Sequence, residues 1–552
     1  LKGRKPKPPG GLRVREGLGL PPNPPPARPL RGAVPPPQAA MGTDREGAAA
    51  AGAVTLSDGR TVKPTLVGGV LTKHASAFVG SRLFTPCGPG VLVYGARTAK
   101  QIAALPSHRG QVTAVCAGPP RSDCPGPLAT GTALGEVRLW DSKGLACLGR
   151  LELAAPVHAL RWPSENTLVV VLGPSSENEK VRVERIEVVS MSEPKVAGPY
   201  PLSAESAGPV DAAGDAVALA DGSSLLVCVE GRTQSRRYPH RDRITAVAVD
   251  PHRRYVAVGD EKGVIWIWWG ILDAGDDSQR VPARWHWHAH PVRALAHCGP
   301  VLLSGGDEGV LCIRNVDEES THFVPRLPSA ICHIASSANG KHLCLSLEEN
   351  SLGLIDGLHG WVRPRMIHGL DVPVSKLSAR GGGGAALHTM SDGQLAASGG
   401  GRKVQFLDEK GAILGARTLM LDRGGCTTAN ADPMERWQLQ QIVFSAVAKC
   451  LLTCETRRSP ALQRFDEEGT SGCVLKWWVL GEDGRYTLDS VAHDPHEAEV
   501  TVALAQPLKD TAFVTASLDG TFKSWDRLPV GNGNAAGLLS GGGSRASAGA
   551  LP

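Results

Sequence analysis

Three histidines at alternate positions are the strongest candidates for metal chemistry in this sequence. His286, His288 and His290 fall in one short run, and in an extended strand their imidazoles would share a face, as a zinc site requires. No cysteine or carboxylate completes a ligand set, and His288 also fits a repeated spacing described below. Cys450 and Cys454 have no second cysteine pair at zinc-site spacing. We therefore predict that these residues are structural and that the chain holds no metal.

Sequence motifs for catalysis give no stronger candidate. Glycine-rich turns at residues 88–90 and 381–384 are not followed by the Gly-Lys-Ser/Thr of a phosphate-binding loop. We find no nucleophile elbow and no paired-carboxylate motif. We predict a protein that is not an enzyme, with no catalytic residues and no cofactor. Loops that are distant in sequence can still assemble a site that the sequence hides.

A recurring spacing is the most informative pattern in the chain. Each copy begins with a His, and a β-branched residue follows four positions later. A turn Gly comes next. The residue that ends the following strand lies five positions after this Gly, which is six positions after the residue before it. The four copies are His108/Val112/Gly135/Trp140, His240/Ile244/Gly263/Trp268, His288/Val292/Gly309/Arg314 and His496/Val500/Gly520/Trp525. The strand-end residues close short alternating runs, which is typical of strands with one buried face. This pattern indicates the WD repeat, a four-stranded propeller blade of about 40–45 residues.

The polar residues of this spacing predict a hydrogen-bond network within each blade. In the last copy His496, a hydroxyl from Thr515 or Ser517, Asp519 and Trp525 would join, and such a buried network stabilises only when every member is satisfied. Leu134, Lys262 and Glu308 replace the Asp in the other copies and Arg314 replaces one Trp, so we expect those blades to depend on apolar packing. The predicted network residues are His108, Trp140, Asp141, His240, Trp268, His288, His496, Ser517, Asp519 and Trp525.

The repeat predicts an all-β fold: a WD-repeat β-propeller of seven blades followed by a second, apparently incomplete propeller. We place the first propeller at residues 65–367, with its third and fourth units, near 148–238, lacking the His–Trp pattern. About three further blades fit in residues 368–527. We expect disorder in a Pro/Gly/Ala-rich segment at residues 1–64 and in a Gly/Ala/Ser-rich tail at 528–552. Three blades cannot close a ring, so we expect the chain to be a fragment of a longer protein, or partner blades to come from elsewhere.

Composition bounds the class of protein. Thirteen cysteines in scattered positions indicate a reducing compartment, and no apolar run approaches the length of a transmembrane helix, so we expect no membrane partner. The net charge is +5, but residues 1–40 hold eight Lys/Arg and one Glu, so they carry 8 − 1 = +7 and the rest carries 5 − 7 = −2. Since Met41 resembles a natural start, residues 1–40 are either non-native upstream sequence, which we favour, or a basic RNA-binding arm.

Basic residues between the strands are candidates for contact with phosphates or with a protein partner. They would line one rim of a propeller, and their alternative role is ordinary solvated surface. These residues are Arg241, Arg243, Arg253, Arg254, Arg326, Arg363, Arg365, Arg402 and Lys403.

Several segments also resemble one family. Residues 286–292, 302–306, 323–327 and 331–334, and later 495–497 and 514–523, are similar to the nucleolar tandem-propeller WD-repeat subunit of the t-UTP (UTP-A) subcomplex of the small-subunit processome. The resemblance runs through residues 66–526 and is patchy at 148–238 and 371–470. The Phe-x-Pro-Arg-Leu segment at 323–327 is not a general feature of WD repeats.

This resemblance implies a nucleolar, non-catalytic scaffold in ribosome biogenesis. It implies early assembly on the 5′ external transcribed spacer of nascent pre-rRNA, with other t-UTP propeller proteins as partners, and support of small-subunit rRNA processing and of transcription by RNA polymerase I. Whether RNA is contacted directly stays open. The alternatives are a WD-repeat adaptor or substrate receptor in a ubiquitin-ligase or signalling complex, and a propeller enzyme with a site in its central channel.

Overall fold

All regular structure in the described part of the chain is β-strand. The computed structural model describes residues 54–55, 61–62, 69–174, 179–231, 234–273, 281–324, 327–357, 364–370, 386–390, 395–398, 403–407, 419–420, 436–445, 447–458, 473–496, 500–506, 511–527 and 544–550. These residues form ten four-stranded sheets and one two-stranded sheet, and every paired strand is antiparallel to its neighbour. The predicted all-β propeller class is therefore confirmed. No helix long and apolar enough to cross a membrane occurs in this part of the chain.

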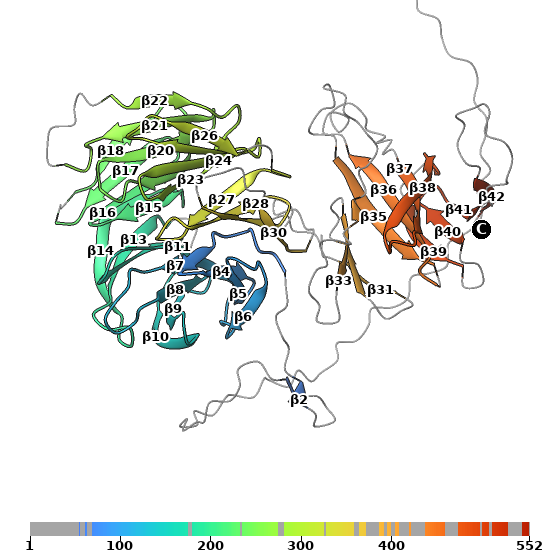
Figure 1. Cartoon of the computed structure of the whole chain (residues 1–552), viewed down its shortest axis with the longest axis horizontal. Helices are drawn as coiled ribbons and strands as arrows, with labels where there is room; N and C mark the ends of the chain where they lie inside the picture. Colours follow the sequence, from blue (N-terminus) through green and yellow to red (C-terminus); the bar gives the residue numbers. More distant parts are fainter. Residues whose placement is uncertain are drawn as a thin grey trace, which may run out of the picture. The chain divides into compact units, whose positions relative to one another are not determined.

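Seven of the sheets follow one another along the first part of the chain, and each uses four consecutive strands (Figure 1). In chain order the seven sheets contain β3 (Ala77–Val79), β4 (Arg82–Cys87), β5 (Gly90–Gly95) and β6 (Gln101–Leu105); β7 (Val112–Ala117), β8 (Pro127–Thr132), β9 (Glu136–Asp141) and β10 (Ala146–Glu152); β11 (Val157–Ser164), β12 (Thr167–Leu172), β13 (Val181–Glu187) and β14 (Lys195–Ala204); β15 (Val210–Ala213), β16 (Ala216–Asp221), β17 (Ser224–Val229) and β18 (Arg236–Pro239); β19 (Ile244–Val249), β20 (Tyr255–Asp260), β21 (Val264–Trp269) and β22 (Ala283–His286); β23 (Val292–Cys298), β24 (Val301–Gly306), β25 (Leu311–Asn315) and β26 (Thr321–Val324); and β27 (Ile331–Ser336), β28 (His342–Leu347), β29 (Ser351–Asp356) and β30 (Arg365–His368).

Burial along the strands follows from their place in each sheet. The second strand of a sheet, such as β12, is buried almost throughout, because neighbouring sheets cover both of its faces. Its sequence is accordingly a continuous apolar run rather than an alternating one. The fourth strand, such as β10, is mostly exposed. The first strands of successive sheets lie against one another around the ring.

The third and fourth sheets form without the His–Trp pattern. Between them lies one buried apolar cluster, whose members include Val171 and Val183 from the third sheet and Val217, Leu219 and Leu226 from the fourth. Several of these side chains are fully excluded from solvent. Burial of this kind contributes about 1.5–3 kcal/mol for each large aliphatic side chain. These two sheets therefore share an apolar cluster in place of the His–Trp network, together with the Arg161–Asp211 ion pair at 2.9 Å.

The first and seventh sheets meet and close the ring, which Figure 1 shows as blue strands next to yellow ones. Leu83 and Leu92 share one core with Leu352 and other residues of the seventh sheet. Asn350 lies in the turn before β29, fully buried and with a φ of 61°. Its side-chain oxygen accepts a hydrogen bond from the Leu71 amide at 2.6 Å, and its side-chain nitrogen donates to the carbonyls of Gly69, at 3.0 Å, and Leu370. We call these three bonds the Asn350 latch.

Three further four-stranded sheets follow later in the chain. They contain β31 (Ala386–Thr389), β32 (Leu395–Ser398), β33 (Lys403–Leu407) and β34 (Leu419–Met420); β35 (Arg436–Phe444), β36 (Cys450–Arg458), β37 (Cys473–Leu480) and β38 (Tyr486–His493); and β39 (Val500–Ala505), β40 (Ala512–Ser517), β41 (Thr521–Arg527) and β42 (Ser544–Ala550). Apolar clusters join the first of these sheets to the second and the second to the third.

Two short stretches differ from the predicted disorder at the ends of the chain. Within residues 528–552, β42 pairs along the outer edge of β41, so the tail prediction is not met at Ser544–Ala550. Within residues 1–64, β1 (Val54–Thr55) pairs with β2 (Thr61–Val62). Residues 1–40, together with Met41, lie outside the described residues. The exact domain boundaries remain a prediction.

Candidate functional site

The last sheet contains a hydrogen-bond network centred on the hydroxyl of Thr515. His496 lies with its Nε2 at 2.8 Å from Thr515 Oγ1, and the Trp525 indole donates to the same oxygen at 2.8 Å. His496 Nδ1 lies 3.1 Å from the Asp519 carboxylate. Ser517 accepts a bond from the backbone amide of Asp519 at 3.3 Å. Of the two hydroxyls considered from sequence, Thr515 therefore links His and Trp.

The second sheet repeats this arrangement with Thr130. His108 Nε2 lies 2.8 Å from Thr130 Oγ1, the Trp140 indole donates to Thr130 at 2.9 Å, and His108 Nδ1 lies 3.2 Å from the Pro89 carbonyl oxygen. A carbonyl oxygen only accepts, so Nδ1 of a neutral imidazole must donate and Nε2 must accept from the threonine. Burial, and then the charge of Arg138, lower the pKa of His108 to about 4. Every polar atom of this neutral network is thus paired.

Asp141, expected in this network, lies elsewhere. Its carboxylate accepts bonds from the backbone amides of Lys143 at 3.0 Å and Gly144 at 2.8 Å. It therefore caps the turn between β9 and β10. An aspartate directly after a strand-end Trp is well placed for such a turn, because its short side chain reaches the next backbone amides.

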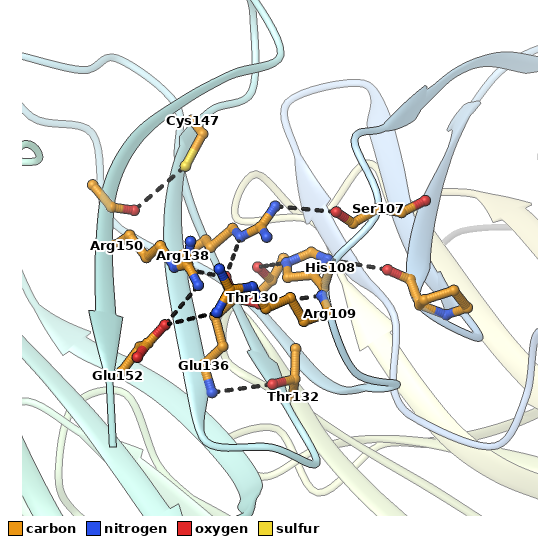
Figure 2. Close-up of polar contacts among 12 residues, drawn as sticks. Ser107, His108, Arg109, Thr130, Thr132, Glu136, Arg138, Cys147, Arg150 and Glu152 are labelled. Atoms are coloured by element: carbon orange, nitrogen blue, oxygen red, sulfur yellow. Dashed lines mark hydrogen bonds and ion pairs between the residues drawn. The ribbon is translucent and has the colours of Figure 1, made fainter. Parts of the chain in front are cut away.

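A buried carboxylate occupies the space beside His108 in the second sheet (Figure 2). Glu136 is 4% exposed, and it lies 2.7 Å from Arg138 Nε and 2.8 Å from Arg150 Nε. Arg150 also pairs with Glu152 at 2.6 Å. Burial alone would raise the pKa of Glu136, but its hydrogen bond from Arg138 and the charges of both arginines bring the pKa below its usual value. This sheet therefore replaces the missing Asp with an ion-pair cluster and does not rely on apolar packing alone.

The fifth sheet places its network on different residues from those expected. In the second and last sheets, the threonine lies two residues beyond the residue that pairs with the Trp. In the fifth sheet Trp268 pairs with Val256, so the equivalent position on β20 is Val258. With no hydroxyl there, Trp268 packs into the core against Tyr238, at 5.3 Å between ring centroids. The indole of Trp266 donates to the buried Asp260 at 2.9 Å. The prediction that Trp268 is the polar partner is therefore wrong for this sheet.

His240 lies beside the fifth-sheet network, in the loop before β19, but its Nε2 has no hydrogen-bond partner among the described residues. Its Nε2 lies 3.6 Å from the Asp260 carboxylate, and its ring meets that of Trp266 edge-on at 5.2 Å between centroids. Asp260 also accepts bonds from the backbone amides of Lys262 and Val264, both at 2.9 Å. The carboxylate thus lies at the end of β20 and not in the turn position that Lys262 occupies.

The sixth sheet keeps a polar link through a glutamate. His288 Nε2 lies 2.8 Å from Ser304 Oγ, and its Nδ1 bonds to Glu308. Burial raises the pKa of Glu308, but the hydrogen bond from His288, a bond from its own backbone and the charges of His288 and His290 together bring the pKa below its usual value. The expectation that Glu308 leaves this blade to apolar packing is wrong, since the longer side chain reaches the imidazole. Arg314, at the Trp position, stacks its guanidinium on Trp285, 4.0 Å from the ring centroid.

Two of the three histidines considered for a metal face solvent. His286 and His290 are exposed, while His288 is buried and bonded as above. Cys454 lies with its sulfur 3.5 Å from that of Cys473, both in the core between two sheets. Within the described ranges, no group of three His, Cys, Asp or Glu side chains lies where it could hold a metal ion.

The ninth sheet has a network member that the sequence pattern missed. The Trp478 indole donates to Thr453 Oγ1 at 3.0 Å, and Lys476 pairs with the buried Glu455 at 2.7 Å. The Thr and Trp are ten positions apart in the second and last sheets but 25 apart here. The long β36–β37 connection hides the spacing. The nearly continuous apolar run Cys473–Leu480, which contains two adjacent Trp residues, is the signal that could have located Trp478.

The predicted basic residues fall into three groups. Arg253 pairs with Asp215, Arg254 with Asp250 and Asp317, and Arg365 with Asp356. Arg241 and Arg243 are exposed in the loop before β19. Arg326, Arg363, Arg402 and the side chain of Lys403 lie outside the described residues. Three predicted contact residues therefore have carboxylate partners within the protein.

Comparison with known proteins gives a consistent match. Residues 227–350 match a family model described as the WD repeat-containing protein 75 first beta-propeller. This range includes His240, Asp260, Trp266 and the His288–Glu308 pair. The chain is 24% identical over 491 residues to WD repeat-containing protein 75 of Danio rerio, covering 82% of this chain and 54% of the relative. The predicted resemblance is confirmed.

Two other relatives agree with this relationship. WD repeat-containing protein 75 of Homo sapiens is 26% identical over 312 residues, which cover 53% of this chain and 34% of the human protein. The U3 small nucleolar RNA-associated protein 17 of Schizosaccharomyces pombe is 33% identical over 149 residues, covering 25% of this chain and 18% of that protein. The chain thus spans about half, or less, of the curated relatives it matches. It is a WD-repeat protein similar to WD repeat-containing protein 75.

Proposed function

We propose that this chain is a non-catalytic scaffold in ribosome biogenesis. It assembles early on nascent pre-rRNA as part of the small-subunit processome, in the nucleolus, beside other t-UTP/UTP-A propeller proteins. The observation that carries the proposal is the match over 82% of the chain to WD repeat-containing protein 75, with a U3 small nucleolar RNA-associated protein among the relatives. Assembled on the 5′ external transcribed spacer, the scaffold would support small-subunit rRNA processing and transcription by RNA polymerase I.

The bonding of the polar residues supports a structural rather than a catalytic role. His108, His288 and His496 each have both ring nitrogens bonded within their own sheet or to an adjacent turn. A general acid or base needs a nitrogen that can reach a substrate proton. The repeated histidines therefore act as ties within the blades, leaving the outer surfaces for partners.

Depletion of the protein from its own cells tests this function. Pulse-labelled RNA should then show precursors that retain the 5′ external spacer, and a fall in small-subunit rRNA relative to large-subunit rRNA. Nuclear run-on should show reduced transcription by RNA polymerase I. Re-expression of the chain is the control for specificity. Unchanged rRNA ratios after complete depletion would contradict the proposal.

A further inference from the structure

Two exposed aromatic rings and one arginine meet at the outer rim between the fifth and sixth sheets. Trp285 is on β22, Trp287 directly follows that strand, and Arg314 and Phe323 are on β25 and β26. Trp287 is 44% exposed and Phe323 39% exposed, and their ring centroids are 6.0 Å apart. We call Trp285, Trp287, Arg314 and Phe323 the rim cluster. Large aromatic side chains exposed together on a protein surface commonly mark a binding site.

Strand register explains why these side chains share one surface. Arg314 pairs with Thr321, and Cys312, two residues earlier on the strand, pairs with Phe323. Alternate residues of a strand point to the same face, so Arg314 and Phe323 lie on one face of the sixth sheet. Contact between Arg314 and Trp285 shows that this face is the one directed toward the fifth sheet. The rings are exposed because they lie on or next to the outermost strands.

Arg314 carries a charge that no carboxylate neutralises among the described residues. Its guanidinium lies 4.0 Å from the ring centroid of Trp285 and 5.6 Å from that of Trp287, and Nη1 donates to Thr321 at 3.2 Å. Its Nε is buried with no hydrogen-bond partner within the described part of the chain. An arginine held on a ring face keeps its charge available to an anion.

A second arginine–aromatic site on the same sheet pair shows the contrast. Trp269 is also 44% exposed, and its ring lies 4.8 Å from that of Tyr255. The nearby Arg254, however, pairs with Asp250 at 2.9 Å and with Asp317 at 2.6 Å. Its charge is therefore already neutralised. Each site has one Trp that is 44% exposed, but the rim cluster adds a second exposed ring, Phe323, and a cation without a carboxylate partner among the described residues.

We propose that the rim cluster is a binding site for single-stranded RNA. Bases would stack on Trp287 and Phe323 while a backbone phosphate meets the guanidinium of Arg314. Stacking platforms beside a cation are the general chemistry of single-strand binding, and the ring faces give little sequence preference. The uncompensated positive charge favours an anionic polymer over an apolar peptide. This inference deepens the proposed function by naming a direct RNA contact.

Binding of the purified full chain to a labelled single-stranded oligouridine of about 12 nucleotides tests the site. Trp287→Ala and Phe323→Ala should each raise the Kd about tenfold. Arg314→Gln should reduce the slope of log affinity against log salt concentration by the amount expected for about one phosphate contact. Trp269→Ala is the matched control and should change the Kd less than about twofold. Trp287→Phe should retain most of the affinity, and thermal melting checks that each variant is folded.

Either of two results would overturn the site. Equal affinities for the Trp287→Ala, Phe323→Ala and Trp269→Ala variants would show that the rim cluster does not stack bases. Unchanged RNA affinity together with loss of a co-purifying protein from cells would show that the surface binds a protein instead. Unchanged rRNA processing in depleted cells would contradict the proposed function. Unchanged RNA affinity of the purified variants would contradict only this site, so the two failures are distinguishable.

Discussion

At the scale of single residues, three of the sheets each place a threonine hydroxyl at the centre of a polar network. Thr130, Thr453 and Thr515 each accept a bond from an indole, and Thr130 and Thr515 also bond a buried histidine. The sequence spacing predicted the His and Trp partners, but it left the hydroxyl open between Thr515 and Ser517. Both lie on β40, and only the register with β41 decides which one faces the Trp.

Replacement of Thr130 by Val tests this hydroxyl. The change leaves the Trp140 N–H and His108 Nε2 buried without partners, so we expect a loss of about 2–4 kcal/mol in the free energy of unfolding. Thr130→Ser keeps the hydroxyl and should lose only about 1 kcal/mol with the missing methyl group. Urea unfolding measures both. Equal losses for the two variants would show that packing, and not the hydroxyl, matters.

The protonation state of His108 predicts a pH dependence of stability. Its pKa is about 4 in the folded protein and about 6.5 when unfolded. Between these values the unfolded chain binds a proton that the folded chain does not, so stability is full above pH 6.5 and is lost as pH falls toward 4. Urea unfolding from pH 7.5 to 4.5 measures this loss. His108→Gln should lose less stability than the wild type over that interval, and parallel curves would contradict the assignment.

At the scale of elements, the sheets obtain the same fold from different interactions. The second sheet uses an ion-pair cluster, the fifth uses Asp260 with Trp266, and the third and fourth use apolar packing. Sequence alone predicted the existence of these sheets, because strand alternation is a local property. It misplaced the fifth-sheet network, because Trp268 pairs with Val256 and the hydroxyl position two residues further along β20 holds Val258, which only the strand pairing reveals.

Leu219 tests the dependence of the fourth sheet on apolar packing. It is fully buried in the cluster between the third and fourth sheets. Leu219→Ala should cost about 2–5 kcal/mol in the free energy of unfolding, measured by urea titration. Val189→Ala, at a position that is 70% exposed, should change stability by less than about 0.5 kcal/mol. A similar small effect at both positions would mean that these sheets have another source of stability.

At the scale of the whole molecule, the first seven sheets close through packing and the Asn350 latch rather than by exchange of a strand between the ends. Each sheet is built from consecutive strands, so none of the described strands links the first sheet to the seventh. Closure removes open faces that would otherwise contact other chains. The sequence predicted seven blades, but nothing local marks Asn350, because its partners at Gly69 and Leu71 are distant in the chain.

Asn350→Gly tests the closure. Glycine accepts the positive φ but removes all three latch bonds, so we expect a loss of about 2–4 kcal/mol. Hydrogen exchange should rise in β3 and β4 and in β28 and β29 before it rises in the third and fourth sheets. Asn339→Gly, in an exposed turn, is the control. Uniform exchange across the seven sheets would show that the latch does not control closure.

The most direct test of the scaffold proposal is affinity purification of the tagged protein from its own cells, with and without RNase, followed by identification of proteins and RNA. We predict recovery of other t-UTP propeller proteins together with RNA from the 5′ external transcribed spacer, and loss of that RNA after RNase. Recovery of ubiquitin-ligase or signalling components without pre-rRNA would contradict the proposal and favour an adaptor.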